Sequence, residues 1–305
     1  MECNKVLLDS VNSFLKINTG KAVIGLLLVL LLSSTLTPIA LLASLISSSL
    51  LFPLIVLLLC TTVVVMLMFG YMSLLALLYR GQPAILGHIF DCFRDWKRGI
   101  KLSLLFSTML IIISFVAVIV AFTVTFSEQK TSQLLFEEAI TKIMNVMPFM
   151  TIICIVVFAL FVVWPNAFVW LVFTDNPAFT IKQTFRKAHS LQKGKMWRLL
   201  FFLFRIGGIW LCVACLSSFV SSIVSIKFMD VIASGNQGLH YSFIIKICDT
   251  VSFVGFYYVL IKMMVGVIAF YDALIRDERE NSIFDKNVQS IEVPVIELPA
   301  PDMES

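Results

Sequence analysis

The chain has 305 residues, of which 59% are hydrophobic and only 14% are charged, and its mean hydropathy is +0.97. A soluble domain is nearer half apolar and one-quarter charged, so this composition excludes an ordinary soluble globule and indicates a protein that lies largely in lipid. The net charge of +4 is too small and too localised to indicate nucleic-acid binding. It is better explained as a signal for orientation in a membrane.

Long apolar runs predict six membrane-spanning helices. No charged residue lies between Lys21 and Arg80, a run of 58 residues, whereas one span needs about 20. This run therefore holds two spans, with a turn near residues 44–53, where three serines precede Pro53. The six predicted spans are residues 22–44, 52–79, 102–127, 146–174, 199–226 and 242–275.

These spans predict an all-α, polytopic fold. Residues 1–275 form the membrane domain. Residues 276–305 form an acidic tail with three prolines, which we expect to be disordered.

The distribution of basic residues predicts the orientation. Of the Lys and Arg residues outside the spans, seventeen lie in the alternate segments that include both termini, and only four lie in the opposite segments or at their borders. Cytoplasmic loops of membrane proteins carry this excess. We therefore expect a multi-pass protein of the bacterial inner membrane with both termini in the cytoplasm and the lipid bilayer as its main partner.

Two of the predicted cytoplasmic segments have an amphipathic pattern. Gln82–Arg98 and Asn176–Lys193 each begin with a proline near the start, continue with apolar residues at helical spacing and end near a glycine. An apolar stripe beside basic residues is typical of a helix that lies flat on an anionic leaflet. We expect both segments to be such helices, with Phe93 and Phe185 buried toward lipid or the helix bundle.

A related pattern suggests an internal repeat. A surface helix, a glycine–lysine junction and a helical hairpin recur up to three times, and the junctions are Gly20-Lys21, Gly99-Ile100-Lys101 and Gly194-Lys195. Three parallel copies would account for six spans. The alternative is that any loop entering a membrane needs a glycine and a lysine.

The stretch Asn176–Phe202, NPAFTIKQTFRKAHSLQKGKMWRLLFF, resembles a motif of an uncharacterised bacterial multi-spanning family. It is similar to the YciC-like proteins and to the membrane domain fused to some glycerophosphodiester phosphodiesterases. The matching positions are Ala178, Phe185, the stretch 191–194, Arg198 and Phe201. The resemblance implies a bacterial cytoplasmic membrane protein and carries no catalytic residue, because the phosphodiesterase domain is absent.

The sequence contains no recognisable catalytic or cofactor signature. We find no metalloprotease, nucleophile-elbow or phosphate-loop motif, and the three histidines lack the spacing of metal ligands. We therefore predict no enzymatic activity, no metal site and no cofactor.

Charged residues inside spans are costly and are candidates for function. Lys262 lies 14 residues before Arg276, about 21 Å along a helix and past the middle of the bilayer. Arg205 lies about 10 Å inside the fifth span, where snorkelling is feasible. Asp272, at a similar depth on the sixth span, is a possible partner for Arg205, and Lys246 and Asp249 form a natural local ion pair near the outer end.

The fourth span is interrupted at its centre by Trp164-Pro165-Asn166. Proline frees a backbone carbonyl and Asn166 adds an amide, so we expect a kink that turns polar groups inward. Together with Lys262, Arg205 and Asp272, Pro165 and Asn166 define a candidate polar pathway. A packing kink is the alternative.

These features favour a non-enzymatic membrane protein: a transporter-like or lipid-handling component, or the membrane subunit of a complex with other membrane proteins. The alternative is a structural or adaptor protein that recruits partners through its cytoplasmic helices and tail. An intramembrane lipid enzyme is a third and weaker possibility. A polar cavity reaching Lys262 would favour transport, and a sealed bundle would favour the adaptor.

Overall fold

The structure is a computed structural model, which describes residues 2–46, 51–127, 166–233 and 239–289. Every regular element in these ranges is a helix. They are α1 (Glu2–Ile46), α2 (Leu51–Tyr79), the short 3-10 helix η1 (Leu86–Phe90), α3 (Asp91–Arg94), α4 (Trp96–Ser127), α6 (Val169–Asp175), α7 (Ile181–Gln192), α8 (Met196–Ala233) and α9 (Leu239–Gln289).

Four of these helices are long and apolar enough to cross a membrane, and the stretches that qualify are Lys5–Leu36, Leu51–Tyr79, Met196–Ser217 and Phe243–Glu280. The prediction of an all-α, multi-pass membrane protein is therefore confirmed. The third predicted span, residues 102–127, lies within α4, which is not one of these four helices. Of the fourth, only the end from residue 166 lies in the described part of the chain.

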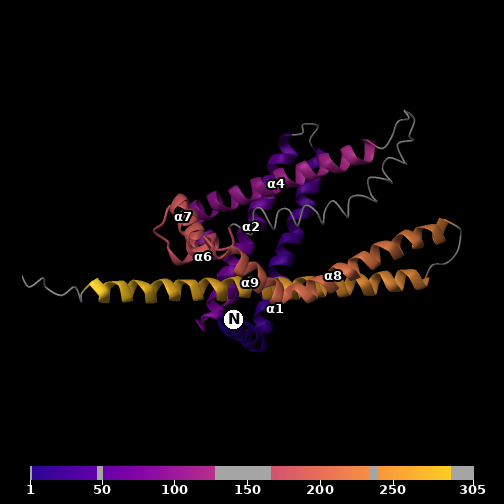
Figure 1. The fold of residues 1–305 in the computed structure, drawn as a ribbon. Coiled ribbons are helices and arrows are strands. Elements are labelled where there is room, and N and C mark those ends of the chain that lie inside the picture. Colours follow the sequence, from indigo (N-terminus) through magenta and orange to yellow (C-terminus); the bar gives the residue numbers. More distant parts are fainter. Residues whose placement is uncertain (1, 47–50, 128–165, 234–238, 290–305) are drawn as a thin grey trace, which may run out of the picture.

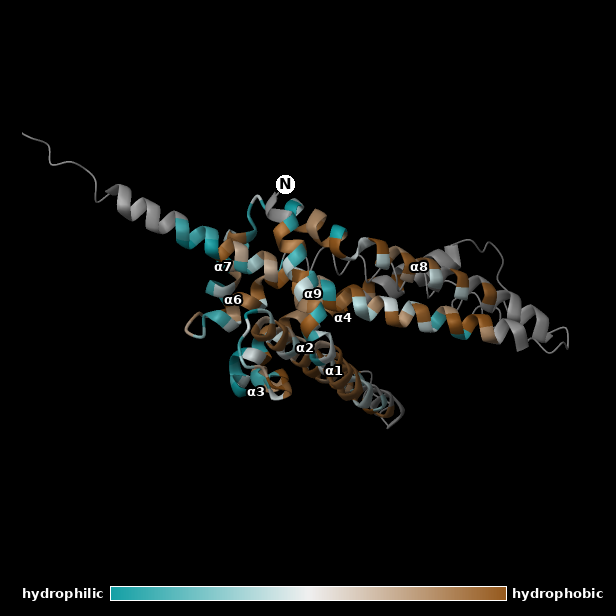
Figure 2. Cartoon of the chain, turned by 90° about the horizontal axis from the view of Figure 1, so that it is seen from below, coloured by the Kyte–Doolittle hydropathy of each residue, from teal (hydrophilic) through white to brown (hydrophobic). Residues whose placement is uncertain are grey.

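The helices pack as pairs that meet at one region. Figure 1 shows α1 beside α2 and α8 beside α9, the two pairs running in different directions and crossing near the middle of α9. Figure 2 shows mainly hydrophobic residues along these helices, whereas hydrophilic residues gather around α3, α7 and the C-terminal part of α9. We call the region where α1, α2, α6 and α9 meet the junction.

A buried apolar core fills the junction. Tyr71 of α2 is fully buried, and its hydroxyl donates to the Ala22 carbonyl of α1 at 2.9 Å. On the other side, Phe168 packs against Phe270 and Tyr271 of α9. Buried aromatic rings contribute much of the apolar area that stabilises such a core, and a buried tyrosine hydroxyl also needs a hydrogen-bond partner.

The amphipathic segments differ from the prediction. Residues 82–98 are not one helix, because η1, α3 and the start of α4 divide them, and Ile89 and Cys92 are buried in the core. The second segment does form a helix, but α7 begins at Ile181 and not at the proline. The Thr180 hydroxyl caps it by accepting a hydrogen bond from the backbone N–H of Gln183. Phe185 is half-buried and packs against Phe106 of α4, and Phe93 is half-buried against the core.

The predicted junctions of the repeat do not share one structure. Helix α1 runs through Gly20-Lys21 without a break, and Gly99 lies inside α4. Of the glycines at these three junctions, only Gly194 follows the end of a helix, with a φ of 73° that suits glycine. The three glycine–lysine segments therefore do not share one backbone geometry.

The C-terminal tail is helical where it is described. Helix α9 continues beyond Ile275 to Gln289, whereas the sequence predicts disorder from residue 276. Glu278, in this C-terminal part of α9, forms an ion pair with the Lys187 ammonium of α7 at 2.5 Å, and this contact favours an ordered helix there. Residues 290–305 lie outside the described residues.

Candidate functional site

Lys262 lies on α9 and is half-buried. Its Nζ atom stands 4.9 Å from the centre of the Tyr258 ring, one turn earlier on the same helix, and that ring packs edge-on against Trp210 of α8. A cation over an aromatic face is attracted by the ring's negative face. Among the described residues, no carboxylate forms an ion pair with Lys262.

Two predicted ion pairs are wrong. Asp272 does not bind Arg205, which is exposed on α8, but Arg80 at the end of α2. Asp249 does not bind Lys246 but accepts a hydrogen bond from Ser221 of α8. In both cases the observed partner comes from a different part of the fold, Arg80 after α2 and Ser221 in α8, and helix packing brings it to the carboxylate.

Only part of the predicted kink at residues 164–166 lies in the described part of the chain. Residues 166–168 form a turn before α6, with Asn166 half-buried, and Pro165 lies outside the described residues. The structure thus divides the candidate polar pathway. Asp272 belongs to an ionic cluster at the junction, Lys262 lies over the Tyr258 ring, and Arg205 is exposed.

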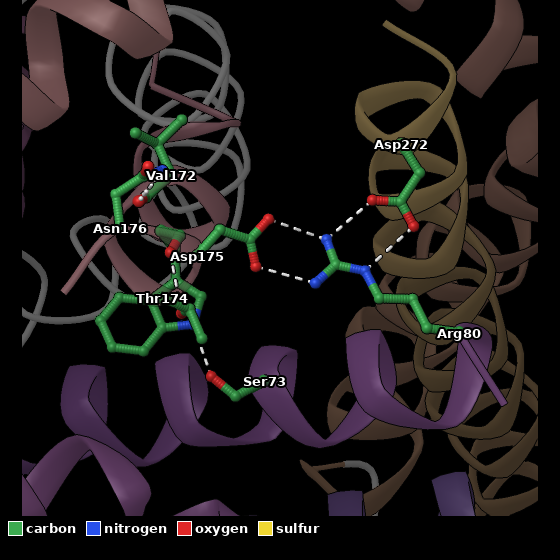
Figure 3. A network of polar contacts seen from close by, with 8 residues as sticks. Ser73, Arg80, Val172, Thr174, Asp175, Asn176 and Asp272 are labelled. Atoms are coloured by element: carbon green, nitrogen blue, oxygen red, sulfur yellow. Dashed lines mark hydrogen bonds and ion pairs between the residues drawn. The ribbon is translucent and has the colours of Figure 1, made fainter. Parts of the chain in front are cut away.

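The most developed polar site is the Arg80 hub, which consists of Arg80, Asp175 and Asp272 (Figure 3). The two terminal nitrogens of Arg80 donate to the two oxygens of Asp175 at 2.8 and 2.9 Å. The Nε and Nη2 atoms donate to the two oxygens of Asp272 at 3.1 and 2.7 Å. One guanidinium therefore binds two carboxylates in the bidentate geometry that gives strong and directional ion pairs.

The hub joins three elements far apart in sequence. Arg80 follows α2, Asp175 ends α6 and Asp272 lies in α9. Their side chains are 26, 29 and 24% exposed, so the cluster is shielded but not sealed from solvent. Burial lowers the pKa of Arg80, but the hydrogen bonds and charges of the two carboxylates outweigh it and raise the pKa above its usual range. The guanidinium therefore stays charged.

Aromatic packing fixes α6 so that Asp175 reaches Arg80. The Trp170 ring stacks on Phe69 of α2 with a centroid distance of 4.5 Å, and its indole nitrogen donates to the Ser73 hydroxyl at 3.0 Å. The Asn176 side chain donates to the Val172 carbonyl and closes the last turn of α6. This short helix is thus held by α2 along its length.

A second arginine ties the start of α4 to the same region. Arg98 donates to Asp95 at 3.0 Å and to the Pro177 carbonyl at 2.5 Å. Its guanidinium carbon lies 4.4 Å from the centre of the Phe173 ring of α6. Arg98 therefore connects the first amphipathic segment to the loop after α6, and this contact adds a cation–π attraction to the hydrogen bonds.

The chemistry of the hub is that of a structural clamp. All three nitrogens of the Arg80 guanidinium donate to a carboxylate. The described residues contain no group of His, Cys, Asp and Glu that could hold a metal ion. Burial, helped by the charge of Asp95, raises the pKa of the Cys92 thiol to about 12, so this thiol is not a nucleophile at neutral pH.

The sequence reasoning missed Arg80 and Asp175 as site residues. Arg80 served only as the end of the first apolar run and as an orientation charge, and Asp175 was given no role. Their positions along the chain gave a signal. Arg80 and Asp175 each stand at the end of an apolar run, and Asp272 stands near the end of the last apolar run, four residues before Arg276. No protein-family model, curated protein or solved structure matches the chain.

Proposed function

We propose that this chain is a membrane subunit without catalytic activity of its own. It would have six spans, lie in the bacterial inner membrane with both termini in the cytoplasm, and assemble with other membrane proteins. The third and fourth spans would be α4 and the segment that ends in α6. The motif at residues 176–202 supports a relation to YciC-like membrane proteins.

The observation that carries this proposal is the Arg80 hub. A guanidinium whose hydrogen bonds go to two carboxylates has a positioning role, because it joins α2, α6 and α9 and all three of its nitrogens are already engaged. The helices that lead away from the junction expose apolar side chains such as Leu31, Ile209 and Leu216. These faces suit lipid or the helices of a partner.

The proposal is tested by photo-crosslinking in cells. A photoreactive residue at Ile209 or Leu216, seven apart on one face of α8, should give a discrete adduct with another membrane protein, and a residue at the buried position Leu199 should give none. The level of that partner should fall in a deletion strain and return with the wild-type chain. Lipid adducts alone at both exposed positions, with no partner lost on deletion, would contradict the proposal.

A transporter-like or lipid-handling role is the second candidate, and Lys262 favours it. A half-buried ammonium within a span is costly unless it is used or compensated. Lys262→Met keeps the length and removes the charge. Normal assembly with loss of the deletion-rescue phenotype would support transport, whereas full rescue by Lys262→Met would leave Lys262 with a packing role over Tyr258.

A further inference from the structure

The first turns of α8 carry an exposed aromatic stripe formed by Trp197, Phe201 and Phe204. These side chains are 73, 69 and 62% exposed. Their spacing of four and three residues places them on one face of the helix. The opposite face, which includes Leu199 and Phe202, is buried in the core. This part of α8 is long and apolar enough to span a membrane, and in a membrane the stripe would face lipid.

Two arginines border the stripe on one side. Arg198 and Arg205 are seven residues apart, so they lie about 10 Å apart along the helix and about 20° apart around it. Both are exposed, and neither forms an ion pair with a described residue. The sequence contains no Asp or Glu between Asp175 and Asp230, so α8 offers no counter-charge near either arginine, and its single acidic residue, Asp230, lies 25 positions beyond Arg205.

An arginine inside a span needs an anion or water within reach of its guanidinium. Arg205 is close enough to the start of α8 for its side chain to snorkel toward the membrane surface. The anion that a bilayer holds at that level is the phosphate of a phospholipid, and the planar guanidinium binds phosphate with two parallel hydrogen bonds. Lys193 and Lys195, just before α8, add positive charge at the same end.

We propose that Arg198 and Arg205 bind the headgroup of an anionic phospholipid, whose acyl chains lie along the aromatic stripe. The lipid belongs to the leaflet at the start of α8, which is the cytoplasmic leaflet in the topology proposed above. A second copy of the chain is a poorer occupant, because a symmetric contact between two α8 stripes would set arginines against arginines with no acidic residue to pair them. The inference needs only that α8 spans the membrane, not that the chain is a complex subunit.

The test is native mass spectrometry of the purified full-length chain with equal amounts of phosphatidylglycerol and phosphatidylcholine. Wild type should retain phosphatidylglycerol preferentially. Arg198→Met and Arg205→Met should each reduce the preference about fivefold, the effect of one basic residue near an anionic surface, and Arg205→Lys should keep most of it. The control Lys246→Met removes one exposed charge from α9 away from the stripe and should leave the preference unchanged.

A second measurement does not depend on the arginine variants assembling. Brominated phosphatidylglycerol should quench the tryptophan fluorescence of wild type more than brominated phosphatidylcholine does, and Trp197→Phe should remove the difference. Equal quenching by the two lipids, or an equal loss of preference in the Lys246→Met control, would overturn the proposal.

Discussion

Gly70 of α2 lies directly against the backbone of Ile89 in η1. A Cβ atom at residue 70 would come within 1.7 Å of the Ile89 carbonyl oxygen and 2.5 Å of its carbonyl carbon. Backbone atoms cannot move aside as the end of a flexible side chain does. The absence of a side chain at residue 70 is therefore what allows the first amphipathic segment to pack on α2.

Gly70→Ala should consequently destabilise the protein by about 2–3 kcal/mol, because η1 must move away from α2. The measurement is thermal unfolding of the detergent-purified variant. Gly20→Ala is the matched control: Gly20 lies within α1, and no atom lies within 4 Å of the place that an alanine methyl group would take. It should be neutral or stabilising by up to about 1 kcal/mol. Equal losses for the two variants would refute the close approach.

Removing Arg80 should be more damaging than removing either carboxylate. Arg80→Gln leaves two neighbouring partly buried carboxylates without a cation, and we expect a loss of about 2 kcal/mol or more in unfolding free energy. Arg80→Lys should recover little, since an ammonium cannot bind both carboxylates in bidentate fashion. A double-mutant cycle with Asp272→Asn measures the coupling. The exposed Arg186, which has no ion pair among the described residues, supplies the control Arg186→Gln.

Lys97 and Arg98 are adjacent in sequence but have different surroundings. Substituting each in turn therefore distinguishes a role of this segment at the membrane surface from a role in internal packing. Arg98→Gln should lower stability, because it removes the contacts to Asp95 and Pro177. Lys97→Gln should leave stability within about 0.5 kcal/mol, because Lys97 is exposed. Thermal unfolding of both variants decides the matter, and a larger loss for Lys97→Gln would contradict the assignment of Arg98.

The proposed topology predicts the results of reporter fusions. A fusion after Lys187 should report the cytoplasm, and fusions after Gln133 and Gln237 should report the opposite side, because of the bias in basic residues. A reporter after Lys187 that reads outside would reject six spans with cytoplasmic termini. A fusion after Tyr79 that reads inside would place the Arg80 hub at the cytoplasmic ends of the spans.

Periodicity and apolar length were sufficient to predict the long helices, because the need to satisfy the backbone within lipid leaves few alternatives. The start of α7 was displaced from Pro177 to Ile181 because the Thr180–Gln183 capping box is a local signal that outweighed the proline. Residues 82–98 were harder to predict, since the close packing of η1 on Gly70 of another helix is not visible in their own sequence.

The partners of the site residues could not be predicted from local sequence either. Arg80 and Asp272 are 192 positions apart, and nothing in the local sequence around either one indicates the other. A charge at the end of a span has several possible partners, and packing geometry selects among them. The exposure of Trp197 was equally hidden, because the first turns of α8 are apolar on both the buried and the exposed face, as Leu199 and Phe201 show.

Helix α9 is a single helix of 51 residues, about 76 Å long and more than twice the thickness of the hydrocarbon core of a bilayer. It carries Lys262, Asp272 and Glu278 on one continuous rod. A force that displaces the part beyond Arg276 would therefore also displace Asp272 and strain its ion pair with Arg80. Because the helix is continuous, the same displacement would be transmitted to Lys262 and Tyr258. A mechanical load on the C-terminal segment would reach the membrane interior without any intervening hinge in the described helix.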